Sequence, residues 1–204
     1  MRLWTAIRMT LVLTVLTGII YPVVMTVVSE TFLPFQARGS LIARNGHVVG
    51  SELIGQNFSA PGYFHGRPSA AGDKGYDATN SSGSNLGPTN KALIDTTRQH
   101  LKEILEQNPG TSAADVPISQ ITASGSGLDP EISPAGAVMQ ARRVAKARGM
   151  SDEQVLDLIR THTRTRWAGV LGEAGVNVLE LNLALDDLSP ARAANAKSAS
   201  ARSE

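Results

Sequence analysis

The hydrophobic pattern of the chain begins with an uncharged run near the N-terminus. Residues Met9 to Ser29 contain no charged side chain, with Arg2 and Arg8 before the run and Glu30 after it. A helix over 9–29 would be about 31 Å long at 1.5 Å per residue, which matches a hydrocarbon core of ~30 Å. The run therefore predicts a transmembrane helix over 9–29.

The charges that flank this run predict its orientation. Arg2 and Arg8 lie in a short segment, 1–8, that has no acidic side chain. Positive flanks stay on the cytoplasmic side, so we expect 1–8 in the cytoplasm and 30–204 outside it, with the helix in the cell inner membrane. The alternative is a cleaved signal peptide, because the residues up to Ser29 suit a cleavage point, although its apolar region needs only about 7 to 15 residues.

Small and hydroxylated residues recur inside the run at three- and four-residue spacing and so share one helix face: Thr10, Thr14, Thr17, Gly18, Tyr21 and Met25. Such residues let membrane helices approach closely and hydrogen-bond across the gap, so a contact of Thr10, Thr14, Thr17 and Gly18 with a partner helix is one interpretation. The other is that the threonines bond their own backbone at i−4 and only fill an anchor. Pro22 predicts a kink.

Beyond the anchor, the pattern predicts a hairpin, a long loop and a helix. Asn45-Gly46 lies between two β-favouring runs, which predicts a β-hairpin over 40–51. The stretch 55–88 is rich in Gly, Ser, Asn and Pro, and a loop of this length is usually functional or disordered. An apolar stripe at helical spacing then predicts a helix over 88–108.

Capping residues predict two more helices. The segment Pro134–Arg148 follows Ser133, which suits an N-cap, and precedes Gly149, which suits a terminator. Ser151 and Gln154 have the spacing of a capping box before a short helix with an apolar side through 155–162.

Two stretches predict strands. Residues 116–121 are a candidate strand, and the leucines at 179, 181, 183 and 185 alternate with other residues as in a half-buried strand. Helices and strands mix without βαβ alternation, so we predict an α+β fold: one N-terminal transmembrane helix and a single extracytoplasmic domain over 30–188. Ala, Ser and Arg dominate 189–204, which predicts a disordered tail.

The composition argues against several function classes. The formal net charge is +1 with 18% charged residues, so a nucleic-acid partner is not expected. The chain has no cysteine, which excludes disulfides, thiol nucleophiles and Cys-ligated zinc. The four histidines, His47, His65, His100 and His162, lack short ligand spacing, so no metal site is predicted.

No catalytic motif is complete, so no catalytic residue is predicted. An ion pump needs an aspartate that is phosphorylated and ligands within the membrane, and the single run contains no carboxylate. The glycines of 83–87 lack the spacing and the lysine of a phosphate-binding loop. Neither serine of 124–127 has glycine two residues to each side, as a hydrolase nucleophile requires. A membrane-anchored hydrolase or binding protein acting alone stays an alternative.

The loop Tyr63-Phe64-His65-Gly66-Arg67-Pro68 combines two aromatic rings, an imidazole and an arginine with turn residues. Aromatic and arginine side chains dominate interface energetics, so Tyr63, Phe64, His65 and Arg67 are predicted to contact a partner. The alternative is that the aromatic rings hold the loop on its own domain.

Motifs spread from residue 17 to about 186 resemble the C subunit of the bacterial Kdp potassium-transporting P-type ATPase. They are Thr17–Pro22, Gly39–Ile42, Gly50–Gln56, Tyr63–Ala70, Gly83–Pro88, Thr122–Pro130, Ile132–Pro134 and Val176–Asn182.

The resemblance implies an accessory, non-pumping and non-catalytic subunit of a high-affinity potassium uptake complex. Its implied partners are a channel-like potassium-binding subunit, a P-type ATP-hydrolysing subunit and the lipid bilayer. ATP and potassium would be handled by the complex, and the family's C subunit is described as a catalytic chaperone that raises ATP affinity. Some liken its glycine-rich stretch to a nucleotide signature, which would place nucleotide at Ser82, Gly83, Ser84 and Asn85. Here serine stands at 82 in place of the usual glycine, which weakens a direct role.

Overall fold

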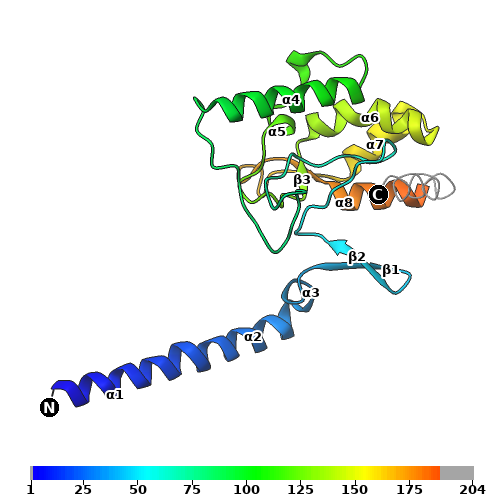
Figure 1. The fold of residues 1–204 in the computed structure, drawn as a ribbon. Helices are drawn as coiled ribbons and strands as arrows, with labels where there is room; N and C mark the ends of the chain where they lie inside the picture. Colours follow the sequence, from blue (N-terminus) through cyan, green and yellow to red (C-terminus); the bar gives the residue numbers. More distant parts are fainter. Residues whose placement is uncertain (1, 189–204) are drawn as a thin grey trace. The chain divides into compact units, whose positions relative to one another are not determined.

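The computed structural model describes residues 2–188 and divides the chain into two compact units, each described by itself. Unit 1 is Met1–Ser51 and unit 2 begins at Glu52 (Figure 1). The predicted disordered tail, 189–204, lies outside the described residues.

Unit 1 begins with a helical segment, Arg2–Phe32, that is long and apolar enough to cross a membrane, with a mean hydropathy of 2.3. It consists of α1 (Arg2–Val15), a π-helical turn η1 (Leu16–Ile20) and α2 (Tyr21–Phe32). The helix predicted over 9–29 is thus present and extends beyond both predicted ends.

The π turn lies directly before Pro22, the residue predicted to kink the helix. In this turn the N–H of Tyr21 donates to the carbonyl of Leu16, five residues earlier. Proline has no N–H, and its ring crowds the carbonyl four residues before it, here that of Gly18. A wider turn at this point is a recognised way to relieve such crowding.

The rest of unit 1 is a short helix and the predicted hairpin. Helix α3 (Pro34–Ala37) precedes β1 (Leu41–Arg44) and β2 (His47–Ser51), which pair antiparallel. Asn45 and Gly46 have φ of 51° and 79°, the left-handed values that a two-residue hairpin turn requires. The hairpin prediction is confirmed.

Unit 2 opens with a long connection, since residues 55–90 contain no helix or strand. Helix α4 (Lys91–Gln107) follows, and the Asn90 side chain accepts from the N–H of Ala92 at 2.8 Å. The helix predicted over 88–108 is therefore confirmed with a start three residues later, at a capping asparagine.

The strand predicted over 116–121 is wrong. The chain there forms η2 (Ala113–Asp115), a 3₁₀ turn, and then the short helix α5 (Ile118–Ile121). Pro117 precedes α5 with φ −62° and has no N–H to give to a β-ladder. Proline thus favours the start of a helical turn here.

The two helices predicted from capping residues are confirmed. Helix α6 (Pro134–Arg148) has Ser133 as its N-cap and ends at Gly149, which adopts the left-handed conformation. Helix α7 (Asp152–Thr161) begins with the complete capping box between Ser151 and Gln154.

The leucine-rich strand predicted over 179–185 is also wrong, because the segment is helix α8 (Val178–Leu188). Val178, Leu181, Asn182 and Leu185 are spaced by three, one and three residues, so one helical face buries all of them. Leucine favours helices, and the Asn177 side chain accepts from the N–H of Glu180 at 3.1 Å, which begins the helix.

A small antiparallel sheet and three helices enclose the core of unit 2. The sheet has the order β3-β5-β4, from Glu131–Ile132, Gly175–Asn177 and Thr163–Arg164. Side chains from α6, α7, α8, β3 and β5 pack around Phe64, which comes from the long connection. Figure 1 shows α4 at the edge of unit 2, and no residue of α4 is buried. The predicted α+β class is confirmed.

Candidate functional site

The loop Tyr63–Pro68, predicted as a contact surface, begins in the interior of unit 2. Phe64 is 0% exposed and Tyr63 5% exposed. The Phe64 ring joins the core cluster, and the Tyr63 ring lies 5.6 Å from that of Phe58. Burial of an aromatic side chain stabilises a fold by several kcal/mol relative to its truncation. The buried rings of Tyr63 and Phe64 thus hold this loop against its own domain.

Two side-chain amides pair with the backbone of this loop. Asn182 on α8 accepts from the N–H of Phe64 at 2.8 Å and donates to its carbonyl at 2.9 Å. Gln140 on α6 does the same for His65, at 2.8 and 3.1 Å. Buried backbone groups need partners, and here amides take the place of a neighbouring strand.

Two arginines of α6 bind carbonyls of residues 61–63, where the chain enters this loop. The Nη1 of Arg143 donates to the carbonyls of Pro61 and Tyr63 at 2.6 and 2.9 Å. The Nε of Arg143 donates to Asn108, and its Nη2 donates to Gln140. Burial lowers the pKa of Arg143 to about 10, which leaves it protonated at neutral pH. Each of the three guanidinium nitrogens of Arg143 therefore donates within the domain.

Arg148 makes the second set of contacts. It is 3% exposed, donates to the Gly62 carbonyl at 2.5 Å and pairs with Asp186 at 2.9 Å. Its guanidinium lies 4.6 Å from the Tyr63 ring centre, within cation–π range. The Tyr63 hydroxyl donates to Asp186 at 3.0 Å, and its pKa is raised by burial and by that carboxylate. The Asp186 carboxylate thus binds both Arg148 and Tyr63.

His65 is held as a neutral imidazole. Burial, and to a lesser degree the nearby Arg143 charge, lowers its pKa to about 4. Its Nε2 lies 3.1 Å from the Ala60 carbonyl, which only accepts, so we assign the ring proton to Nε2. The Arg143 nitrogen 3.5 Å away is then a contact between donors.

A cavity of about 290 Å³ lies beside this loop, between it and α4, α5 and α6. Its lining is mixed: apolar Phe58 and Met139, and polar residues that include His65, Gln120 and His100. His100 Nδ1 lies 3.1 Å from the Ile121 carbonyl, so both histidines contact backbone carbonyls. Gln120 is buried and its Nε2 has no partner among the described residues. In residues 2–188 no group of three His, Cys, Asp or Glu side chains lies close enough to hold a metal ion.

Arg67, the last predicted contact residue, faces the same cavity. It pairs with Asp129 at 2.8 Å and donates to the Ser119 carbonyl at 3.2 Å. The structure therefore brings Tyr63, Phe64, His65 and Arg67 together, each in contact with its own domain. A contact of this loop with a partner stays a prediction.

In the stretch Ser82, Gly83, Ser84 and Asn85, the first two residues lie against the serine- and glycine-rich segment 124–127. The Ser82 N–H donates to the Ser126 carbonyl at 2.9 Å. A Cβ on Gly83 would lie 2.9 Å from the Gly125 carbonyl, and one on Gly127 2.5 Å from the Ser82 carbonyl. Glycine lets two backbones approach this closely. The Ser82 N–H is thus occupied, and a nucleotide contact stays a prediction.

The predicted helix stripe lies in unit 1. Thr17 donates its hydroxyl to the Leu13 carbonyl at 2.8 Å, and Thr26 bonds Pro22 in the same i−4 manner. For Thr17, such a bond is the alternative role considered for the threonines of the stripe. A contact of Thr10, Thr14, Thr17 and Gly18 with a partner helix stays a prediction.

The polar residues that fix the loop were missed in the sequence: Gln140, Arg143, Arg148, Asn182 and Asp186. Four of them lie in segments predicted as a helix, 134–148, or as a strand, 179–185. A helical reading of 178–188 would have placed Asn182 on the same face as Leu181 and Leu185, and a polar residue on a core face signals a buried hydrogen bond.

Comparison with known families supports the resemblance seen in the sequence. The family model described as KdpC, the K+-transporting ATPase c chain, matches residues 3–187. The match covers both units and includes α8 up to its last residue but one.

Individual relatives agree over nearly their whole length. A protein of Polaromonas naphthalenivorans, named potassium-transporting ATPase KdpC subunit, is 54% identical over 182 residues, which cover 89% of this chain and 92% of that protein. Proteins of the same name from Mycobacterium bovis and Koribacter versatilis are 52% and 49% identical, over 92% and 93% of this chain and 98% and 96% of their own lengths.

Proposed function

This chain belongs to the KdpC family of potassium-transporting ATPase c chains, and from that premise we propose that it is an accessory subunit of a high-affinity, ATP-driven potassium uptake complex. The observation that carries the proposal is identity of about half the residues to KdpC subunits over nine-tenths of this chain. The subunit stabilises the assembly and promotes ATP use by a separate catalytic subunit, without itself carrying out catalysis.

The proposed placement follows from the N-terminal helix. Arg2–Phe32 crosses the inner membrane once, with Arg2 and Arg8 at its cytoplasmic end and the main domain outside. The partners are a channel-like potassium-binding subunit and a P-type ATP-hydrolysing subunit, which bind potassium and ATP. We expect two surfaces to contact these subunits: the stripe of Thr10, Thr14, Thr17 and Gly18 in the membrane, and an external surface of unit 2.

An external domain acts on ATP through the other subunits. With the domain outside the cell, any effect on ATP affinity is a coupling free energy between two sites, transmitted through the assembled membrane subunits. The bonds that occupy the Ser82 N–H, the His65 N–H and the His65 Nε2 within the domain support this indirect route.

Deletion and reconstitution test the proposal. Cells that lack this chain should lose growth at limiting potassium, and the remaining complex, purified from membranes, should hydrolyse ATP with a raised KM. Full-length protein should restore both. Unchanged uptake and ATP affinity without the chain would contradict an accessory role.

Protease treatment tests the placement. Unit 2 should be digested once the outer membrane is opened while the inner membrane stays sealed. Digestion that requires lysis of the inner membrane would reverse the proposed orientation.

A further inference from the structure

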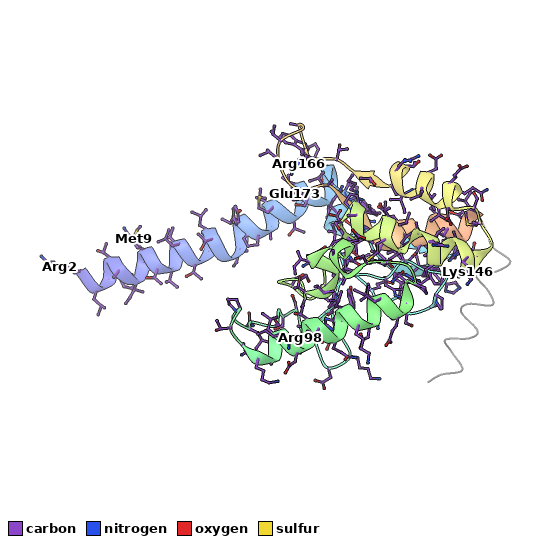
Figure 2. The ribbon with its side chains drawn as sticks, turned by 90° about the horizontal axis from the view of Figure 1, so that it is seen from above. Arg2, Met9, Arg98, Lys146, Arg166 and Glu173 are labelled. Atoms are coloured by element: carbon purple, nitrogen blue, oxygen red, sulfur yellow. The ribbon has the colours of Figure 1, made fainter. Side chains whose placement is uncertain are left out.

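An apolar turn projects from unit 2 between β4 and β5. Two backbone hydrogen bonds, of 2.8 and 3.0 Å, join Trp167 and Leu171. On either side of this pair in the sequence, Arg166 and Glu173 form an ion pair at 2.9 Å. Figure 2 labels Arg166 and Glu173 on this projecting segment. The turn is therefore a closed, hydrogen-bonded structure, which we name the Trp167 turn and define as residues 166–173.

The tip of the Trp167 turn carries large apolar side chains in solvent. Trp167 is 74% exposed, Val170 73% and Leu171 57%, within five consecutive residues. Single exposed apolar residues are common on proteins, but a tryptophan with two aliphatic neighbours on a preformed turn is the composition of an interface centre. Ordering such a turn on binding costs little, because its backbone is already fixed.

The base of the Trp167 turn is acidic. Arg164 binds Glu52, Glu131 and Glu180 together, the last at 3.0 Å, and Arg166 binds Glu173. In these ion pairs two arginines face four carboxylates, which gives the paired groups a net charge of minus two at and beside the base of the turn. This charge opposes adsorption to an anionic lipid surface and complements a basic protein surface.

We propose that the Trp167 turn is the external anchor of this subunit, and that its tip enters an apolar pocket with a basic rim on a membrane subunit of the complex. This inference rests on the proposed accessory function and names the surface it uses. Apolar centres with charged rims are the usual anatomy of protein interfaces. The tip supplies the buried centre, and the carboxylates at its base supply the rim.

Photocrosslinking in the complete complex tests the contact. A benzophenone amino acid at Val170 should form an adduct with a partner subunit, identified by mass spectrometry. The control places the same residue at Ile118 on α5, which is equally exposed at 69% and lies on another element. Adducts at Ile118 but not at Val170 would overturn the proposal.

Paired substitution tests the energetics. The full-length Trp167→Ser, Leu171→Ser variant should bind the other subunits about thirtyfold more weakly, as expected for loss of an interface centre. Its thermal midpoint should match that of the natural chain, because the tip is exposed. Unchanged binding would overturn the proposal, as would a weakening that is matched by a lowered midpoint.

A lipid measurement distinguishes the other occupant. The full chain with Trp4→Phe has Trp167 as its sole tryptophan. In vesicles with brominated lipids and no partner, its fluorescence should stay unquenched, and strong quenching would instead show that the tip enters the bilayer. If the natural chain fails to assemble with any subunit, the proposed function fails; if it assembles normally while the Val170 and Trp167 results are negative, this inference alone fails.

Discussion

Two short segments of unit 2 have similar composition and opposite environments. The loop Tyr63–Pro68 and the Trp167 turn each combine at least one aromatic residue with arginine and glycine in a few positions. Phe64 is fully buried, whereas Trp167 is 74% exposed. Aromatic and arginine content therefore shows that a segment makes strong contacts, but not whether those contacts lie within the domain or outside it.

The difference comes from partners far away in the sequence. The backbone of Phe64 and His65 pairs with Asn182 and Gln140, which are 118 and 75 residues distant. Among residues 2–188, the Trp167 turn pairs only with itself, through the backbone of Trp167 and Leu171 and through the ion pair of Arg166 with Glu173. Amides and arginines on α6 and α8 thus decide which aromatic segment enters the core.

The largest effect should follow truncation of the buried ring. Phe64→Ala should lower the free energy of unfolding by about 4 kcal/mol, because it removes core contacts and leaves a cavity. The thermal midpoint of the full chain in mild detergent, followed by circular dichroism, should fall by about 10 °C. A fall no larger than that caused by substitution of an exposed residue would show that the Phe64 ring is not buried in solution.

The amide pairing should be nearly as important as the ring. Asn182→Leu leaves the N–H and carbonyl of Phe64 buried without partners, which should cost about 3 kcal/mol. Urea titration of the full chain measures this loss. The control is Gln99→Leu on the exposed side of α4, which should change stability by less than about 0.5 kcal/mol. Equal effects would show that the pairing contributes little.

Acid should loosen the buried loop through His65. The pKa of this histidine is about 4 in the folded chain and its ordinary value is 6.5, so the unfolded chain binds the extra proton first as pH falls. Its contribution is complete above pH 6.5 and is lost progressively between 6.5 and 4, at about 1.4 kcal/mol per pH unit. Thermal midpoints at pH 7 and pH 5.5 measure the loss.

The matched variant for the acid experiment is His65→Gln, which cannot titrate. It should show a smaller drop in midpoint between pH 7 and pH 5.5 than the natural chain. Parallel pH profiles for the two proteins would assign the acid sensitivity to another group.

The smallest effect on stability should come from the exposed tryptophan. Trp167→Ala should change the free energy of unfolding by less than about 0.5 kcal/mol, since the side chain is mostly in solvent. The same urea titration compares it with Phe64→Ala. A loss above about 2 kcal/mol would mean that the tip is buried in solution, which would remove the contrast between the segments.

Local signals in the sequence were sufficient for elements whose ends are chemically marked. The Asn45-Gly46 turn, the Ser133 cap and the capping box at Ser151 each satisfy backbone groups within a few residues, so the neighbouring sequence determines them. The family resemblance added the function class, which no single residue motif carries.

Tertiary contacts decided the rest. Leucines at every second position of 179–185 also occupy helical positions, and only burial of the face with Leu181 and Leu185 selects the helix. The position of the Tyr63–Pro68 loop depends on amides and arginines from other elements, which no local pattern reveals. The sequence thus indicated an unusual loop, but not that its aromatic side chains pack inside its own domain.

The π turn at Leu16–Ile20 changes the phase of the helix surface. In a continuous α-helix each residue advances the surface by about 100°, so Thr14 and Met25 would lie nearly in line. The turn uses one residue more than an α-helical turn, as the bond from Tyr21 to Leu16 shows, and therefore offsets the two halves by roughly 100°. A straight partner helix that lay along Thr10 and Thr14, as the predicted contact requires, would therefore pass to the side of Met25.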